Sequence, residues 1–557
     1  MAVNERPLTI ASTNPAKVQA RRYGGEWQLV ALITLLMVVL SLIPTIYANV
    51  TAPDDRFFTG VIFNIPDHNQ YFAWMRDLRH EHLAPNRLTA EPNDPALFHL
   101  LWWSAGRIGD FFGVEYYVIF TLFRVVATVL LVSVAYAFLR IAVPDVKQRW
   151  LAFLFFCFSG GVGFVWIIVK YAQDLPDAPF PFDIYTSEAN SFFQIMAFPH
   201  FAIALALLIG MIGLTLYAQQ RQQLRYAVAA GLVGTLIGLQ HAYDLLTIYS
   251  VLGLWGILIW WRDRRFPVFL GKSAAIIAVC TIPPAGYLAY LVLNDATWGG
   301  KLAQFDNAGA WTPNLLHLPI LMGVPLLLAL IAFRPRMLQS RNDTELLVAI
   351  WFLVHFVLIY LPLKFQIHLL LGWQMPIAIL AATAIYTHVW PWLQQRTPQM
   401  APFLLALILG LSVATNVYIW TWRLYDLTRY SEPYYLAQSE VAALRWLEAA
   451  TTRDDVVLGT LMINQHVPVW TDARAFLAHW AGTLDYFEKV RMAEVVLDPT
   501  AQPAEREAIL NQFAVSYVIA REQDVPREAL LDAAPELELV FAENEVSVYR
   551  VVLERQP

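Results

Sequence analysis

Long apolar runs separated by short polar segments cover the chain from about residue 27 to residue 422. A helix needs roughly 20 predominantly apolar residues to cross the hydrocarbon core of a bilayer. The pattern therefore predicts eleven membrane-spanning helices, at 27–50, 115–142, 150–169, 191–218, 226–239, 245–261, 269–293, 315–333, 345–360, 367–390 and 401–422. The first run is longer than the apolar core of a cleaved signal peptide, so we expect it to remain as an anchor.

One polar interruption, at 240–244, determines the number of spans. We interpret it as a tight turn at the membrane surface, whereas a kink there would reduce the count to ten. With the N-terminus inside and eleven spans, the inner segments hold 15 Lys and Arg, and the short outer loops hold 2. Because cytoplasmic loops retain cationic residues, this ratio favours eleven spans. It predicts a cytoplasmic segment 1–26 and an extracytoplasmic C-terminal region.

Two regions outside the spans are long enough to carry chemistry. In the first outer loop, 51–114, apolar and aromatic residues recur at helical spacing over 71–79, as in a helix lying in the membrane interface. Region 423–557 combines a helical pattern at 434–450, strand-like runs at 456–458 and 516–519, and a hairpin at 537–551. The predicted fold is mainly α. It is a polytopic transmembrane helical bundle over 27–422, followed by an extracytoplasmic soluble α/β domain over 423–557.

Composition supports a multi-pass protein of the cell membrane. Apolar residues make up 58% of the 557 residues and charged residues 15%, against roughly 25% charged in a soluble protein. This excludes a soluble enzyme, a nucleic-acid-binding protein and a disordered scaffold. Residues 423–557 hold 22 acidic and 12 basic side chains, while residues 1–422 hold 22 acidic and 26 basic ones. Such a change in charge indicates a change of environment.

Acidic residues of the first loop are the candidates for a catalytic base. Asp55 follows the first span, Asp67 precedes the helical stretch, and Glu91 lies further along. The neighbouring Asp54 is expected to bind substrate. A carboxylate held at a low-dielectric surface can accept a proton from a hydroxyl. Asp67 is the first candidate, since Tyr71 follows one helical turn later and would share its face, where it could contact substrate; Asp55 and Glu91 are the alternatives. The simpler interpretation is that Asp67 only caps the helix.

Polar side chains also gather near the outer ends of the spans. Under the predicted topology, His200, His241, Asp244 and Gln366 approach the same side of the membrane. Polar groups at membrane depth are costly and usually face a cavity or one another. We therefore expect them to meet the first loop and frame one substrate-binding cavity. For any one of them, an ordinary interhelical hydrogen bond is the simpler interpretation.

Four further residues could bind an anionic group: Arg76, Arg124, Lys364 and His368. Arg124 lies about ten residues into the second span and needs either a carboxylate partner or a lipid phosphate. The motifs of soluble enzymes are absent from the sequence, including a Gly-rich phosphate loop, His-Glu-x-x-His and a nucleophile elbow. No motif supports a divalent metal, and the two cysteines lie in apolar runs, so we assign no cofactor and no disulfide.

This arrangement resembles the lipid-dependent glycosyltransferases of the C superfamily, such as protein O-mannosyltransferases and aminoarabinose transferases. The segments that carry the resemblance are Phe-Thr-Gly at 58–60, Asp67, Tyr-Phe-Ala-Trp-Met at 71–75, Thr-Ala-Glu-Pro at 89–92 and Phe-Gln at 365–366. In that superfamily an acidic residue of the first loop activates the acceptor, and the donor is a polyprenyl-phosphate sugar. The usual adjacent Asp-Glu pair is absent here, as is the basic pair after Phe-Gln.

The resemblance implies an inverting hexosyl or pentosyl transferase at the outer membrane face. Its partners would be a polyprenyl-phosphate sugar, a glycan, lipid or protein acceptor, and membrane lipids, with no nucleic acid. One alternative is a lipid-linked glycan transporter or flippase, although the inner halves of the spans carry few polar residues. The other is a non-catalytic membrane protein that binds glycans. In that case Trp446, Trp470 or Trp480 would stack on sugars, whereas core packing is their simpler role.

Overall fold

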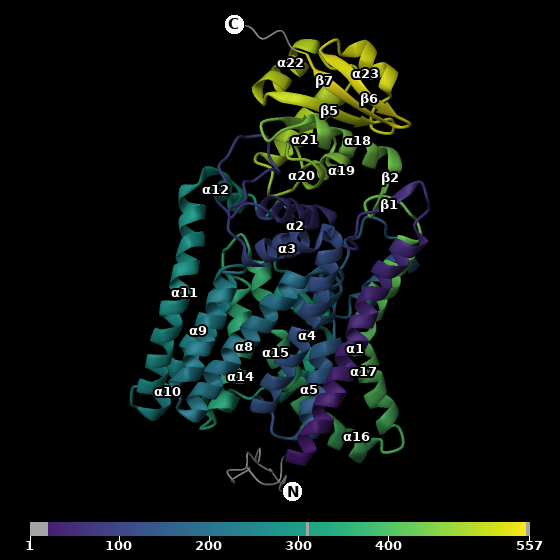
Figure 1. Ribbon diagram of the computed structural model, residues 1–557. Coiled ribbons are helices and arrows are strands. Elements are labelled where there is room, and N and C mark those ends of the chain that lie inside the picture. Colours follow the sequence, from purple (N-terminus) through teal and green to yellow (C-terminus); the bar gives the residue numbers. More distant parts are fainter. Residues whose placement is uncertain (1–19, 308–310, 553–557) are drawn as a thin grey trace.

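The computed structural model describes residues 20–307 and 311–552 (Figure 1). Residues 1–19 of the predicted cytoplasmic segment lie outside the described residues. The described chain forms an elongated molecule with three layers: a helical bundle, a middle layer from the first loop, and a sheet-containing C-terminal domain. The helix α1 (Ala20–Thr51) begins at the end of the bundle that lies opposite the C-terminal domain.

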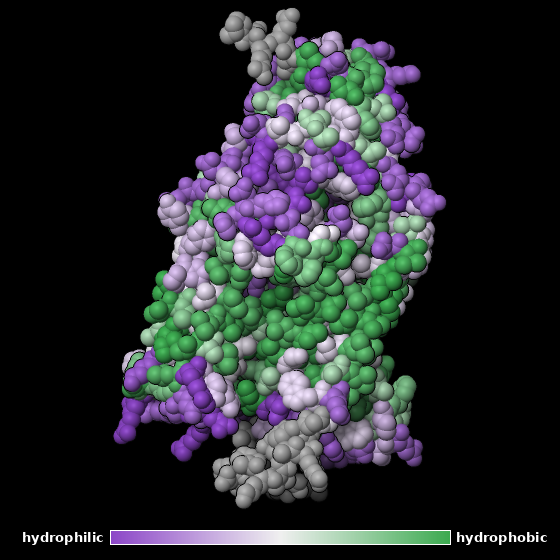
Figure 2. Space-filling model, viewed as in Figure 1, coloured by the Kyte–Doolittle hydropathy of each residue, from purple (hydrophilic) through white to green (hydrophobic). Residues whose placement is uncertain are grey.

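The bundle contains every segment that was predicted to span the membrane. Its other helices are α4 (Tyr116–Ala142), α5 (Val146–Phe158), α6 (Gly163–Ala172), α7 (Ser191–Ala197), α8 (Pro199–Arg221), α9 (Leu224–Gly238), α10 (Asp244–Asp263), α11 (Val268–Asn294), α13 (Leu318–Ala332), α14 (Asp343–Leu358), α15 (Gln374–Ala384), α16 (Trp390–Arg396) and α17 (Ala401–Leu427). The π-helical segment η6 (Ile385–Val389) joins α15 to α16. Figure 2 shows a broad hydrophobic belt around the bundle and hydrophilic ends above and below it. The predicted mainly helical, polytopic fold is confirmed.

The number of crossings is less regular than the prediction of eleven. Among the described residues, eight helical segments are long and apolar enough to cross a bilayer, and the bent pair α5 and α6 makes nine. The helices α9 and α14 are only 15 and 16 residues long. The polar turn expected at 240–244 is present, since α9 ends at Gly238 and α10 begins at Asp244.

The third predicted span is not one continuous helix. Expected over 150–169, it is broken between α5 and α6, which meet at a bend of 43°. A methyl group added to Gly161 would lie 2.3 Å from the Ile320 carbonyl oxygen and 2.3 Å from the Asp183 carboxylate. The Asp183 side chain accepts a hydrogen bond from the Gly163 amide at 2.8 Å. The lack of a side chain at Gly161 thus allows the buried Asp183 carboxylate and the backbone of α13 to approach the break between the two helices.

The first outer loop folds into a layer between the bundle and the C-terminal domain. It contains β1 (Arg56–Phe58), α2 (Ile65–Leu78) and α3 (Leu100–Phe112), and α12 (Ala296–Ala303) lies beside it (Figure 1). The helix expected at 71–79 is therefore present as part of α2. Most side chains of α2 are buried, which shows that other parts of the protein cover it on both sides. It does not lie at an open membrane interface.

The C-terminal domain is built on a five-stranded sheet of order β4-β3-β5-β7-β6, with β3 parallel to β4 and β5 and the β6–β7 hairpin antiparallel. The elements of the domain are β2 (Tyr435–Ala437), α18 (Gln438–Ala450), β3 (Val456–Leu458), α19 (Leu461–Asn464), α20 (Val467–Trp470), β4 (Arg474–Ala475), α21 (Tyr486–Leu497), α22 (Pro503–Gln512), β5 (Val515–Arg521), α23 (Arg527–Ala533), β6 (Leu537–Glu543) and β7 (Val546–Val551). The predicted helix, strands and hairpin are all present.

Buried polar contacts join the first loop to the C-terminal domain. Arg87, 3% exposed, pairs with Asp77 at 3.0 Å and donates to the carbonyl oxygens of Thr471 and Pro468 at 2.7 Å each. The strand β1 pairs antiparallel with β2. A buried guanidinium with all these acceptors resists displacement, because breaking the pair would leave an uncompensated charge. The loop and the domain are thus packed as one unit above the bundle.

Candidate functional site

Asp67 lies at the contact between the first loop and the C-terminal domain. The helix α2 starts two residues earlier, at Ile65. The Asp67 side chain therefore does not cap α2, contrary to the expectation from sequence. Its carboxylate accepts hydrogen bonds from His479 Nε2 at 2.8 Å and Trp480 Nε1 at 3.2 Å, and also from the Asn64 amide. The side chain is 19% exposed, so it is shielded yet reachable.

The protonation of His479 follows from its backbone contacts. The amides of Ala481 and Gly482 donate to His479 Nδ1 at 3.0 and 2.9 Å, so that nitrogen carries no proton. The proton is therefore on Nε2, which donates to Asp67. Burial lowers the pKa of His479 and keeps the ring neutral. Although burial alone would raise the pKa of Asp67, the hydrogen bonds that it accepts from His479 and Trp480 hold the pKa below its ordinary value. Asp67 is thus ionised at neutral pH.

Lys301 brings a cation close to this carboxylate. It extends from α12, is 8% exposed, and donates a hydrogen bond to Gln70 of α2. Its ammonium group lies 4.4 Å from the ring centre of Trp74 and 5.3 Å from that of Trp298. It forms no ion pair with the described residues, and burial lowers its pKa to about 7. An anion that reached this position would supply the missing counter-charge.

Several of the predicted membrane-level residues meet directly below α2. The Tyr71 hydroxyl and His200 Nε2 are hydrogen-bonded at 3.2 Å. The His200 and His241 rings lie 5.7 Å apart, and His241 Nδ1 contacts the Asp244 carboxylate at 2.9 Å. The opposite nitrogen of His241 is 3.1 Å from the Tyr243 hydroxyl. His200, His241 and Asp244 are thus connected to Tyr71 of the first loop, whereas Gln366 is not part of these contacts. That they frame a substrate-binding cavity stays a prediction.

His368 connects these residues, through Phe305, to Trp480 and Asp67. It forms an ion pair with Glu188, and its ring centre lies 5.4 Å from that of Tyr243. Phe305 lies 5.4 Å from His368 and 5.5 Å from Trp480, which contacts Asp67. We call this connected set the α2 cluster. Its members are Asp67, Tyr71, Glu188, His200, His241, Tyr243, Asp244, Lys301, His368, His479 and Trp480.

The other acidic candidates of the first loop lie elsewhere. Asp54 and Asp55 are exposed at the turn before β1, and the Asp55 side chain is 75% exposed. Glu91 accepts two hydrogen bonds of 2.7 Å from Lys489 of the C-terminal domain. Although burial raises the pKa of Glu91, this ion pair lowers it overall. None of the three contacts the α2 cluster among the described residues.

Three of the remaining candidates are held by other partners. Arg124 is buried and donates hydrogen bonds to Thr45 at 2.8 Å and to the Ser41 carbonyl. Its partners are therefore neutral oxygen atoms of α1, and no carboxylate contacts it among the described residues. Lys364 pairs with Asp306 at 2.6 Å. Arg76, on the opposite face of α2, pairs with two carboxylates of the C-terminal domain. The Gln366 side chain is half-buried and forms no hydrogen bond with the described residues.

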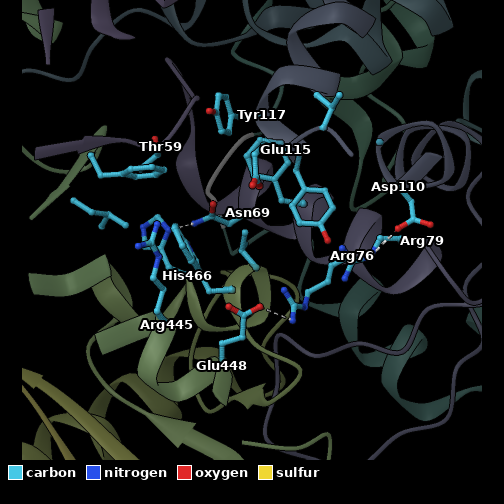
Figure 3. Close-up of a pocket in the computed structure, with 18 of the residues that line it drawn as sticks. Thr59, Asn69, Arg76, Arg79, Asp110, Glu115, Tyr117, Arg445, Glu448 and His466 are labelled. Carbon is cyan, nitrogen blue, oxygen red and sulfur yellow. Dashed lines mark hydrogen bonds and ion pairs between the residues drawn. The ribbon is translucent and has the colours of Figure 1, made fainter. Parts of the chain in front are cut away.

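That opposite face of α2 borders a cavity of about 650 Å³ (Figure 3). The cavity lies between α2, the first residues of α4 and the helices α18 and α20 of the C-terminal domain. Asn69 reaches it from α2 and is hydrogen-bonded to His466 Nδ1 at 3.3 Å. Thus α2 separates two polar regions, with Asp67 on one side and Asn69 and Arg76 on the other.

Sequence reasoning missed His479 and Lys301 as members of the site and considered Trp480 only as a glycan contact. Lys301 had one available signal, since it is the only lysine or arginine in the outer segment 294–314. His479 had none, because 412 residues separate it from Asp67. Within the described ranges, no group of three His, Cys, Asp or Glu side chains is arranged to hold a metal ion.

No protein-family model and no curated protein matches the chain. Among solved structures, the Archaeoglobus fulgidus oligosaccharyltransferase tethered to an acceptor peptide containing the NVT sequon gives a TM-score of 0.56 at 11% identity. That match covers 94% of this chain and 74% of the other. The archaeal enzyme AglB, in complex with an inhibitory peptide and a dolichol-phosphate, gives 0.53 at 12% identity, with 96% and 75% covered.

The mycobacterial arabinofuranosyltransferase AftD gives a TM-score of 0.56 at 13% identity; the match covers 95% of this chain and 42% of AftD. These neighbours are membrane glycosyltransferases of the C superfamily. The resemblance predicted from the sequence is therefore confirmed at the level of the fold. At such low identity the likeness concerns the fold alone.

Proposed function

We propose that the protein is an inverting membrane glycosyltransferase that moves a sugar from a polyprenyl-phosphate donor to an acceptor hydroxyl. The observation that carries this proposal is a carboxylate, Asp67, held in place by His479 and Trp480 beside the membrane bundle. The buried, unpaired Lys301 contacts the same helix, α2, through Gln70. The shared fold with glycosyltransferases, one of them in complex with a dolichol-phosphate, supports it.

In this proposal Asp67 accepts the proton of the acceptor hydroxyl as the acceptor oxygen attacks the anomeric carbon. The bond from that carbon to the donor phosphate oxygen breaks, and its electron pair leaves with the polyprenyl phosphate. The neutral His479 holds the carboxylate in place through its Nε2 proton. An ionised, fixed carboxylate can act as a base without first losing a proton of its own.

Lys301 would bind the donor phosphate in the same proposal. Its ammonium group is buried beside two tryptophan rings and has no carboxylate partner among the residues described. A phosphate would restore its full positive charge and would in turn be stabilised as it accumulates charge on leaving. His368 is a less available cation, because Glu188 already neutralises it.

The proposed topology follows from the loop charges and places the C-terminal domain outside the cell. The donor sugar would then be presented at the outer membrane face, where α2 and α12 lie above the bundle (Figure 1).

The test uses the purified, detergent-solubilised protein with a set of polyprenyl-phosphate sugars. The expected result is release of polyprenyl phosphate together with a glycosylated product, and loss of both with Asp67→Asn. Transport of a lipid-linked glycan across vesicles without consumption of the donor would favour the flippase alternative.

A further inference from the structure

The cavity on the far side of α2 from Asp67 has the features of a carbohydrate-binding site. Its volume of about 650 Å³ is within the ordinary range for a ligand pocket. It lies among the first loop, the start of α4 and the C-terminal domain, above the hydrophobic belt (Figures 1 and 2). A water-soluble ligand is therefore the appropriate class.

The charges around this cavity are balanced. Three arginines, Arg76, Arg79 and Arg445, line it together with three carboxylates, Asp110, Glu115 and Glu448. Such density of charge excludes an apolar ligand, because burying these groups without partners is costly. The equal numbers of opposite charges give no preference for a strongly anionic or cationic ligand. A neutral ligand with many hydroxyl groups can both donate to the carboxylates and accept from the guanidinium groups.

Some of these groups already have partners, while others do not. Arg76 is fixed by Glu448 at 3.2 Å and by Asp472 at 3.0 Å. In contrast, the side chains of Arg445 and Glu115 form no hydrogen bond or ion pair within the described part of the chain, and both are exposed. Figure 3 shows them on different walls of the cavity. The buried Tyr116 hydroxyl also lacks a hydrogen-bond partner among the described residues.

Aromatic rings form a further part of the lining. Trp470 lies edge-on to Phe57 at 5.6 Å between ring centres, and both are only partly buried. Tyr116 and Tyr117 also line the cavity. Aromatic faces offer apolar contact to the C–H faces of a sugar ring, while neighbouring polar groups bind its hydroxyls.

We propose that this cavity binds a neutral oligosaccharide, at a site separate from the Asp67 side of α2. Trp470 and Tyr116 provide the stacking surfaces, and Arg445 and Glu115 bind the sugar hydroxyls. The proposal does not depend on glycosyl transfer, because Asp67 does not line the cavity.

The test measures direct binding to the purified full-length protein in detergent. The probes are maltohexaose, chitohexaose and a linear α-mannohexaose, with an uncharged hexapeptide of Gly and Ser as a comparison. We expect at least one of the oligosaccharides to bind saturably. Arg445→Gln and Glu115→Gln should each weaken binding by about five- to tenfold, and Trp470→Ala by tenfold or more. Arg491→Gln, which changes an exposed arginine outside the cavity, is the matched control and should leave binding unchanged.

Asp67→Asn separates this proposal from the proposed enzymatic activity. It should abolish sugar transfer and leave oligosaccharide binding within twofold of the unaltered protein. If all three oligosaccharides fail to bind, the proposal is wrong. It is also overturned if the peptide binds more tightly than the sugars, or if both Arg445→Gln and Glu115→Gln bind normally. The last two substitutions change exposed, unpaired side chains, so they keep the test valid if Trp470→Ala does not fold.

Discussion

Replacing Asp67 with asparagine removes the proposed base and preserves the shape of the side chain. The amide oxygen of the substituted side chain can still accept from His479 Nε2 and Trp480 Nε1, which now contact Asp67 at 2.8 and 3.2 Å. Hydrogen bonds to a charged group contribute about 1.5–3 kcal/mol and those between neutral groups about 1 kcal/mol. For these two bonds the variant should lose about 1–4 kcal/mol of stability. The Asn64 amide, which donates to the other carboxylate oxygen, also loses its acceptor.

The expected effect on turnover is much larger than the effect on stability. General-base catalysis typically contributes about 10²–10⁴-fold, so release of polyprenyl phosphate should slow by at least about 100-fold in Asp67→Asn. Thermal unfolding of the same preparation confirms that the fold is intact. Asp55→Asn is the matched control, since the Asp55 side chain is 75% exposed, and it should retain activity within about twofold. Turnover of Asp67→Asn within tenfold of the unaltered protein would refute the assignment.

The pH profile provides a second readout of the same residue. Because the contacts of Asp67 lower its pKa, activity should persist through the ordinary carboxyl range and fall only at still lower pH. His479→Phe removes the Nε2 donor while the carboxyl stays shielded, so the pKa of Asp67 should rise. The acidic limb of the profile should then move to higher pH. An unchanged limb in His479→Phe would show that His479 does not control the ionisation of Asp67.

Three further predictions concern other parts of the molecule. Lys301→Gln should lower kcat/KM for the donor about 10- to 100-fold, as expected for loss of a charged hydrogen bond. Since the pKa of Lys301 is about 7, kcat/KM should decline above that pH, and in Lys301→Arg this decline should disappear; a decline retained in Lys301→Arg would contradict the role. Arg87→Met should destabilise the protein by about 3–5 kcal/mol in unfolding measurements, because it leaves the buried Asp77 unpaired, and an unchanged unfolding temperature would contradict this. A periplasmic-type reporter fused after Pro557 should be active, whereas activity of a cytoplasmic reporter alone would overturn the topology.

The bundle could be predicted from sequence because lipid imposes a simple rule on it. Every backbone polar group within the bilayer must form its hydrogen bonds inside the protein, so long apolar segments that cross it become helices. The length of the apolar segments then indicates where the helices lie, and the charge of the loops indicates their orientation. The break between α5 and α6 escaped this reasoning. It depends on Asp183 and Ile320, which approach Gly161 from elsewhere in the chain.

The candidate site was predictable only in part, for a similar reason. Asp67, Tyr71, His200, His241 and Asp244 could be expected to meet, because topology brings them to the same side of the membrane. The partners of Asp67 depend on tertiary structure, because His479 and Trp480 come from the C-terminal domain. A single sequence offers helix capping as a sufficient explanation for an aspartate at that position, whereas in the structure α2 already begins at Ile65 and the carboxylate contacts His479 and Trp480.

The contact between Asp67 and His479 also has a consequence for biosynthesis. The two residues are 412 positions apart, so a ribosome adding about 5–20 residues per second needs roughly 20–80 s between them. Throughout that interval the later helices enter the membrane while the carboxylate lacks its orienting histidine. A nascent or prematurely terminated chain would therefore already have its membrane anchor, while the proposed base would lack its contact with His479. Competence would be acquired only at the end of synthesis, when the final domain folds onto the first loop.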